Sequence, residues 1–162
     1  MTQRPMRPQA RRLPAADCRP ILDKAEYGVL STIWPDGLPY GVPLSFAVLG
    51  GAIYFHCARE GRKIDNIRRN GQVSFAVVGE TRPVYAKNFT TWYESVIISG
   101  TIAEVTDGRE KFDALYALAA KYLPEHLDKA DQDITISLAK TAVYALRPGT
   151  VSGKAKREPE RQ

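Results

Sequence analysis

The sequence has few cysteines and no long apolar run. Its two cysteines, Cys18 and Cys57, make neither a disulfide framework nor a four-ligand zinc site. The longest apolar stretches, such as residues 46–49 and 96–98, fall far short of the roughly 20 residues needed to cross a bilayer. No small-residue cleavage pattern follows the basic N-terminus, so neither a secretory signal nor a membrane partner is expected, and the simplest location is the cytoplasm.

Net charge is also scarce outside the two ends of the chain. Residues 1–19 carry a net charge of +4 and residues 154–162 one of +2, so the stretch between them sums to −1. Basic ends of this kind are usually solvated and mobile. We therefore expect a disordered basic tail over residues 1–13, one domain over residues 14–153 and a polar C-terminal tail over residues 154–162. Nucleic-acid binding through the arginine-rich end is the weakest alternative, and no nucleic-acid partner is predicted.

Alternation of apolar and polar residues predicts several short antiparallel strands. Pro35-Asp36-Gly37 and Gly50-Gly51 are hairpin signals, because proline presets one backbone angle and glycine accepts a positive one. Between these turns apolar residues occupy every second position, which is typical of a strand with one buried face. Strands are expected over residues 27–33, 39–49, 52–58, 72–78, 92–105 and 142–147, with an irregular stretch around Pro83.

Helical spacing separates these strands at four places. Short helices are expected over residues 18–26 and 61–70, and a further helical turn over residues 134–140. The clearest helix begins after Asp107, which is a good cap, and ends before Pro124. Five closely spaced strands, a helix and a returning strand predict a mainly β fold, a six-stranded antiparallel barrel with peripheral helices.

The most informative segment joins the strand ending at Cys57 to the basic helix that begins near Arg62. Free backbone N–H groups at a helix start favour a phosphate, to which Arg62 offers a planar fork and Lys63 a compact charge. His56 and Cys57 lie just upstream, where a planar ring attached to that phosphate would fit. The alternative is that the cations form a solvated helix face.

Three segments together resemble a known family. They are Gly28–Thr32, Pro39–Ser45, and Tyr54–Ala58 followed by Gly61-Arg62-Lys63. Over roughly residues 18–154 the chain is similar to the pyridoxamine 5'-phosphate oxidase-like split-barrel family, and within it to the nitroimidazole-reductase branch. The resemblance implies a six-stranded split barrel of the FMN-binding type that forms homodimers, with FMN at the interface.

The resemblance also assigns roles to individual positions. Arg62 and Lys63 match the pair that holds the flavin phosphate, and His56 and Cys57 match residues beside the flavin ring. The backbone along the flavin edge corresponds to Val42, Pro43, Leu44 and Ser45, and Ser95 stands at a position that is often glutamine in the oxidases. The thiol of Cys57 is interpreted as a small buried hydrophobe rather than a catalytic group.

Residues 147–154 lack the arginine and histidine that bind substrate in the true oxidases, which argues against vitamin B6 oxidation. Lys154 either approaches the cofactor or belongs to a free basic tail. Trp92 and Tyr93 are expected in the core or an interface, or stacked on the flavin ring or substrate. His126 is expected at the surface.

These observations predict an FMN-dependent oxidoreductase that reduces a small acceptor such as a nitroaromatic (nitroimidazole) compound. His56 is the candidate catalytic residue, because an imidazole can give or take a proton near neutral pH. A G-x-G-x-x-G dinucleotide fingerprint is absent. The alternative is a non-enzymatic flavin or haem binder or sensor, in which His56 would be an axial-ligand candidate.

Overall fold

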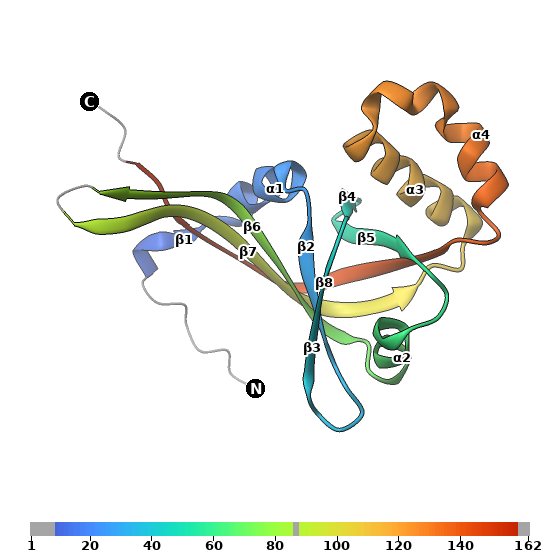
Figure 1. The fold of residues 1–162 in the computed structure, drawn as a ribbon, viewed down its shortest axis with the longest axis horizontal. Coiled ribbons are helices and arrows are strands. Elements are labelled where there is room, and N and C mark those ends of the chain that lie inside the picture. The colour runs from blue at the N-terminus through green and yellow to red at the C-terminus, as the bar shows by residue number, and fades with distance from the viewer. Residues whose placement is uncertain (1–8, 86–87, 159–162) are drawn as a thin grey trace.

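The computed structural model describes residues 9–85 and 88–158, and their strands form one curled antiparallel sheet (Figure 1). The strand order is β3-β2-β6-β7-β8-β5-β4, and the short β1 pairs with β8. The strands are β1 (Arg12–Leu13), β2 (Gly28–Ile33), β3 (Pro39–Leu44), β4 (Ala47–Leu49), β5 (Ala52–Cys57), β6 (Gln72–Tyr85), β7 (Phe89–Glu104) and β8 (Ala142–Lys156). The mainly β barrel class is confirmed, but the sheet has eight strands rather than the six expected.

The sheet curls because its first and last strands, β3 and β4, follow each other in the chain. Only Ser45 and Phe46 separate them, so the single strand expected over residues 39–49 was wrong. Phe46 is fully buried, and its N–H donates to the Tyr122 hydroxyl at 2.9 Å. That hydroxyl in turn donates to the carbonyl of Glu26 at 2.6 Å. The break between β3 and β4 therefore depends on Tyr122, a residue far along the chain.

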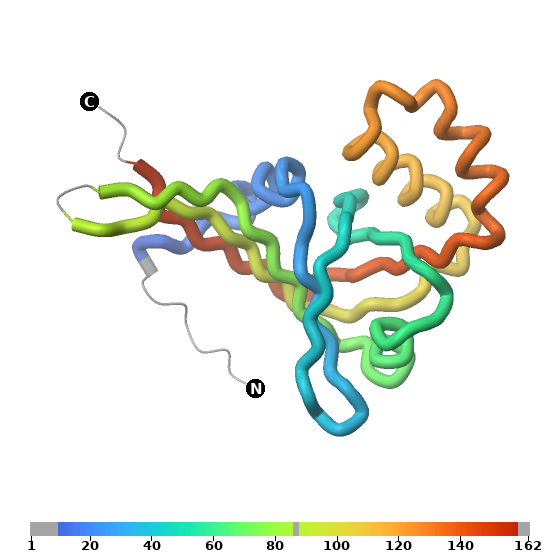
Figure 2. Tube along the Cα trace, in the orientation of Figure 1, coloured from blue at the N-terminus to red at the C-terminus, as the bar shows by residue number. Residues whose placement is uncertain are grey.

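Strands β6 and β7 extend beyond the barrel as a long arm (Figure 2). β6 continues through Pro83 to Tyr85, so the irregular stretch expected after the strand is limited to a register shift between Val78 and Thr81. β2 pairs with β6 only from Ser74 to Ala76, which leaves the outer edge of the arm without a described neighbour. A proline, which lacks an N–H, is tolerated on such an edge.

The ends of the described chain also join the sheet. Arg12 and Leu13 pair with Lys154 and Gly153, and Lys154 pairs on its other side with Ser95. The order of the fold therefore starts before residue 14 and continues past the boundary expected at residue 154. The remaining parts of the two expected tails, residues 1–8 and 159–162, lie outside the described residues.

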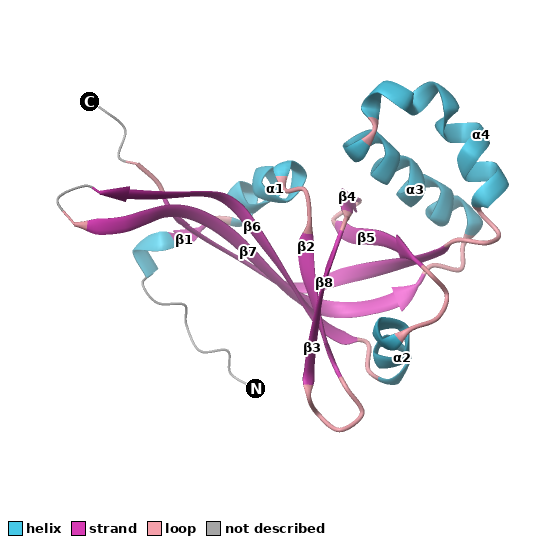
Figure 3. Cartoon of the chain, in the orientation of Figure 1, coloured by secondary structure: helices cyan, strands magenta, loops and turns pink. Residues whose placement is uncertain are grey.

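In the described part of the chain, four α-helices and two short 3-10 turns accompany the sheet (Figure 3). The Asp107 side chain accepts the N–H of Glu110 at 2.7 Å, as a helix cap does. The expected helix after Asp107 is confirmed, whereas the helical turn expected over residues 134–140 is part of a longer helix over residues 127–137, whose Ala130 and Ile134 are buried. The elements are η1 (Gln9–Arg11), α1 (Ala15–Lys24), α2 (Arg62–Arg69), α3 (Gly108–Tyr122), η2 (Pro124–His126) and α4 (Leu127–Ser137). No helix of the described chain is long and apolar enough to span a membrane.

Two hydrophobic clusters lie on opposite faces of the sheet. The inner cluster fills the barrel and includes Phe75 and Tyr144, together with side chains from α1 and α2. The outer cluster lies between β4, β5, β8 and the helices α3 and α4. Tyr54 on β5 donates to Glu110 on α3 at 2.8 Å, and Arg147 on β8 donates to the same carboxylate at 3.1 Å. α3 and α4 thus cover one end of the outer face.

Candidate functional site

The start of α2 has the features of an anion site. Gly61, at the N-cap, has a φ of 122°, a left-handed value that favours glycine. Its carbonyl accepts the N–H groups of Ile64 and Asp65, and no side chain among residues 9–85 and 88–158 caps the helix. The helix is held in place because Ile64 and Ile67 are buried in the inner core. Its first N–H groups and its positive dipole end are therefore available to an anion.

Arg62, the first residue of α2, is held by two aromatic rings of the β2–β3 hairpin. Its guanidinium carbon lies 4.1 Å from the ring centroid of Trp34 and 5.5 Å from that of Tyr40. The two rings meet edge to face, with centroids 6.4 Å apart. Among the described residues Arg62 has no hydrogen-bond or ion-pair partner, so the edge of the guanidinium is free to bind an anion. Neither aromatic residue was predicted as part of the site, although they flank the Pro35-Asp36-Gly37 turn.

A buried hydrogen-bond chain fixes α2 to the same hairpin. Asn66 donates to the Thr32 hydroxyl at 2.9 Å, and both side chains are 1% exposed. The Thr32 hydroxyl donates to the carbonyl of Tyr40 at 3.3 Å. Residues 62 and 66 lie four apart and share one face of the helix, so the ring contacts of Arg62 and the hydrogen bond of Asn66 attach the same helix face to the hairpin.

Lys63 points to a different place from Arg62. Its ammonium lies 5.4 Å from the centroid of Phe55, a core ring that stacks on Tyr144. It also interacts with the Cys57 thiol. Burial raises the pKa of Cys57 above its ordinary value, and the Lys63 ammonium, which acts in the opposite direction, does not cancel that effect. The thiol is therefore neutral at pH 7, in keeping with the interpretation of Cys57 as a small hydrophobe.

His56 and Cys57 lie on opposite faces of the sheet. Cys57 packs against the inner core, whereas Tyr54, two residues before His56, belongs to the outer cluster. Successive side chains of a strand alternate between faces, so His56 is directed outward, where it is exposed beside its partner Val143. The two residues expected beside one ring therefore cannot offer their side chains to the same face of it.

Three of the four predicted backbone contacts lie on β3, an edge strand, and the fourth, Ser45, directly follows it. β3 pairs only with β2, so its second edge is free among the described strands. Val42 and Leu44 pack against the inner core, whereas Pro43 and Ser45 are exposed. The free edge can meet the rim of a planar ligand, as the resemblance predicts.

Ser95 is far from the other predicted residues of its own chain. It pairs with Lys154 in the arm, whereas Glu104 on the same strand pairs with Tyr144, the neighbour of Phe55. Glu104 is nine positions along β7 from Ser95, which is about 30 Å along the strand. One chain thus brings together the start of α2, the end of β5 and the β2–β3 hairpin, but not Ser95.

The arm carries its own group of polar and aromatic residues. Burial acts to raise the pKa of Tyr93, but hydrogen bonding to Arg11 and the positive charge of Lys154 lower it below its ordinary value. The Lys156 ammonium lies 5.0 Å from the ring centroid of Trp92. Lys154 is therefore part of a structured strand next to Tyr93 and Ser95.

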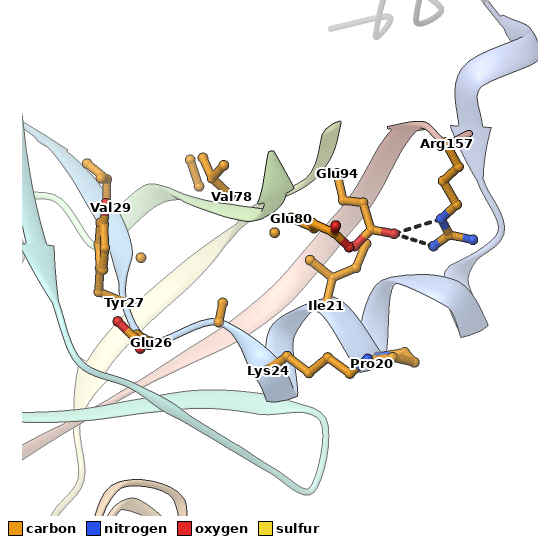
Figure 4. Close-up of a pocket in the computed structure, with 14 residues that line it drawn as sticks. Pro20, Ile21, Lys24, Glu26, Tyr27, Val29, Val78, Glu80, Glu94 and Arg157 are labelled. Carbon is orange, nitrogen blue, oxygen red and sulfur yellow. Dashed lines mark hydrogen bonds and ion pairs between the residues drawn. The ribbon is translucent and has the colours of Figure 1, made fainter. Parts of the chain in front are cut away.

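A hollow of about 500 Å³ opens where β2 separates from β6, above α1 (Figure 4). Tyr27 and Val29 form one wall and Val78 the other, and the Glu94–Arg157 ion pair, 2.7 Å long, closes the far end. A second hollow, of about 510 Å³, adjoins Tyr27 and is lined by Ser45. Among the residues predicted to bind the cofactor, only Ser45 lines either of these hollows.

Comparisons with known proteins agree on the family and the fold. A family model described as pyridoxamine 5'-phosphate oxidase matches residues 14–155. The fold resembles that of a candidate 5-nitroimidazole antibiotic resistance protein from Bacteroides thetaiotaomicron, at 22% identity and a TM-score of 0.78, covering 89% of this chain and 86% of that one. It also resembles a FAD and haem binding protein from Mycobacterium smegmatis, at 19% identity and a TM-score of 0.78, covering 92% of this chain and 75% of that one. No curated protein matches the sequence.

Proposed function

Because this chain belongs to the pyridoxamine 5'-phosphate oxidase family, we propose that it is an FMN-dependent oxidoreductase that reduces a small acceptor such as a nitroaromatic compound. The observation that carries the proposal is the start of α2. There an uncapped helix N-terminus lies beside Arg62, whose guanidinium edge has no partner among the described residues. A phosphate monoester fits this site, because backbone N–H groups and a planar cation both bind phosphate oxygens.

We further propose that the complete site needs two copies of the chain. The outer face of the sheet between β3 and the second half of β8 carries two rows of small or apolar residues with no charge. On antiparallel strands, residues paired in register share a face. The first row consists of Pro43, Val29, Ala76, Ile97 and Ser152. The second row consists of Gly41, Ser31, Ser74, Ser99 and Thr150.

Two observations support this face as the dimer interface. Ile97 is 48% exposed and Val78, near the edge of the rows, is 65% exposed. α1 packs on the other side of the sheet, where it approaches Gly153 through Cys18. A second copy docked on these two rows by a two-fold axis across the strands would bring its arm, with Ser95, toward the α2 end of the first.

Ile97→Glu tests the interface. Burying a carboxylate at the centre of the face is expected to weaken self-association by at least about tenfold, because an unpaired charge is costly to bury. Analytical ultracentrifugation measures the effect. Ile136→Glu is the matched control, because Ile136 is 69% exposed on α4, which covers the other end of the outer face rather than the two rows. A wild-type protein that sediments as a monomer at micromolar concentrations would contradict the dimer.

We propose the following roles for the residues of the site. The flavin, when bound, supplies the redox chemistry. Arg62 and Lys63 hold its phosphate end, and the free edge of β3 aligns the ring. His56 is the candidate to hold or deliver a proton to an acceptor at the outer face. The hollow beside Ser45 and Tyr27 adjoins β3, and its size is within the range of small-molecule pockets.

The direct test is the spectrum and activity of the purified protein. We expect FMN to bind, with absorption bands of an oxidised flavin, and we expect the reduced protein to be reoxidised by a nitroaromatic compound faster than by oxygen. Stopped-flow absorbance measures both rates. Reoxidation by oxygen alone would remove the nitroreductase assignment and leave flavin binding intact, whereas failure to bind any flavin would remove both.

Haem binding is the second candidate. The likeness to a FAD and haem binding protein and the outward, exposed position of His56 favour it. A haem-loaded protein would show a Soret band that is lost in His56→Ala, which separates this candidate from a flavoprotein.

A further inference from the structure

Two aromatic rings of the β2–β3 hairpin limit the directions in which the Arg62 side chain can point. Trp34 lies against the guanidinium at 4.1 Å from its ring centroid, within the range of a cation–π contact. Tyr40 lies at 5.5 Å from the same carbon and edge-on to Trp34, so the two rings limit the directions in which the side chain can point. Stacking uses the face of the guanidinium and leaves the N–H donors at its edge free.

The hairpin and the helix are also fixed relative to each other. The buried Asn66–Thr32 hydrogen bond lies one helical turn beyond Arg62, and Thr32 is bonded to the strand that carries Tyr40. The base of the hairpin therefore cannot move independently of the helix start. Trp34, the residue directly after β2, is bonded through its N–H to the carbonyl of Leu38 and through its carbonyl to the N–H of Gly37, which closes the turn.

We propose that Trp34 is a positioning residue that presents the Arg62 guanidinium edge to the flavin phosphate, and that it determines how strongly the site prefers a phosphorylated flavin to riboflavin. This inference rests on the proposed function. A long arginine side chain loses rotamer freedom when it binds an anion, and a ring that already holds it lowers that cost. The benefit is confined to the phosphate end, because riboflavin has no group that Arg62 would bind.

The experiment compares FMN and riboflavin binding in Trp34 variants by flavin fluorescence titration. Trp34→Leu keeps an apolar side chain without a π-face, and we expect it to raise the Kd for FMN about 3- to 10-fold, with that for riboflavin changed less than about twofold. Trp34→Phe keeps a ring and should restore most of the preference. Leu38→Ala is the matched control, because Leu38 belongs to the same turn and is 61% exposed.

A second experiment separates a positioning effect of Trp34 from a general disturbance of the fold. In a protein that already carries Arg62→Gln, Trp34→Leu should have no further effect on the Kd for FMN, because the residue it positions is gone. Additive losses, or equal losses for FMN and riboflavin, would overturn the inference while leaving the proposed function in place. If the wild-type protein binds FMN no better than riboflavin, the phosphate site fails and this inference fails with it.

Discussion

Replacing Arg62 and Lys63 together by glutamine is expected to weaken FMN binding by about a hundredfold or more. Charge-assisted hydrogen bonds contribute roughly 1.5–3 kcal/mol each, and every 1.4 kcal/mol corresponds to about a factor of ten in Kd. Arg62 supplies a guanidinium edge that has no partner within the described part of the chain, and Lys63 supplies the adjacent charge. Fluorescence titration or isothermal calorimetry measures the change.

The matched control removes the same charge from the same helix. Arg68→Gln with Arg69→Gln acts at the C-terminal end of α2, away from the helix start, and should change the Kd for FMN only by the loss of long-range attraction. Riboflavin is the second control, since its affinity should be nearly the same in all three proteins. Undiminished FMN affinity in the folded Arg62/Lys63 variant would refute the phosphate site.

The single residues of the pair should not contribute equally. Arg62 is directed along the hairpin with a free edge, whereas Lys63 lies above the Phe55 ring and beside Cys57. We therefore expect most of the loss to follow from Arg62→Gln alone. Equal losses would mean that Lys63 leaves its place above Phe55 when the phosphate binds.

Gly28→Ala is expected to destabilise the fold by about 3 kcal/mol, which corresponds to a fall in Tm of roughly 6–12 °C for a chain of this size. A Cβ at residue 28 would lie 2.3 Å from the ring of Phe75. That ring is 1% exposed and packs edge to face on Phe46, with centroids 5.0 Å apart, so it has no free space into which to move. Thermal and urea unfolding measure the loss.

A glycine elsewhere provides the control. At Gly108, the first residue of α3, an added Cβ would meet none of the described atoms within 4 Å other than those of its chain neighbours and the helix backbone, so Gly108→Ala should be neutral or slightly stabilising. Adding Phe75→Leu to Gly28→Ala should recover part of the stability by making room, although it also removes the contact with Phe46. Similar Tm values for the Gly28 and Gly108 variants would show that β2 can move away from Phe75.

Features encoded within a few residues could be predicted from the sequence. The Pro35-Asp36-Gly37 and Gly50-Gly51 turns, the helix that Asp107 caps and the basic helix after Gly61 all depend on local backbone preferences and on the spacing of apolar residues. The membership of the family also follows from the sequence, and the match to residues 14–155 confirms it. Local signals were sufficient there because each element forms from its own residues.

Features that depend on distant partners were decided by the tertiary structure. The break at Ser45–Phe46 exists because Tyr122 reaches it from α3, and β6 continues through Pro83 because β2 leaves its edge free. The opposite faces of His56 and Cys57 follow from alternation, but which face is core and which is open depends on where α3, α4 and α2 pack.

In the candidate site, too, some features could be predicted from the sequence and others were decided by the tertiary structure. Arg62 and Lys63 were recognisable as neighbours in the sequence, whereas the stacking of Arg62 on Trp34, nearly thirty positions away, was not. The separation of Ser95 from the start of α2 depends on strand register, which no local pattern encodes. The chain's residues specify which chemistry is present, and the pairing of its strands specifies which of those residues can meet within one copy, because register and packing are set by contacts between segments distant in sequence.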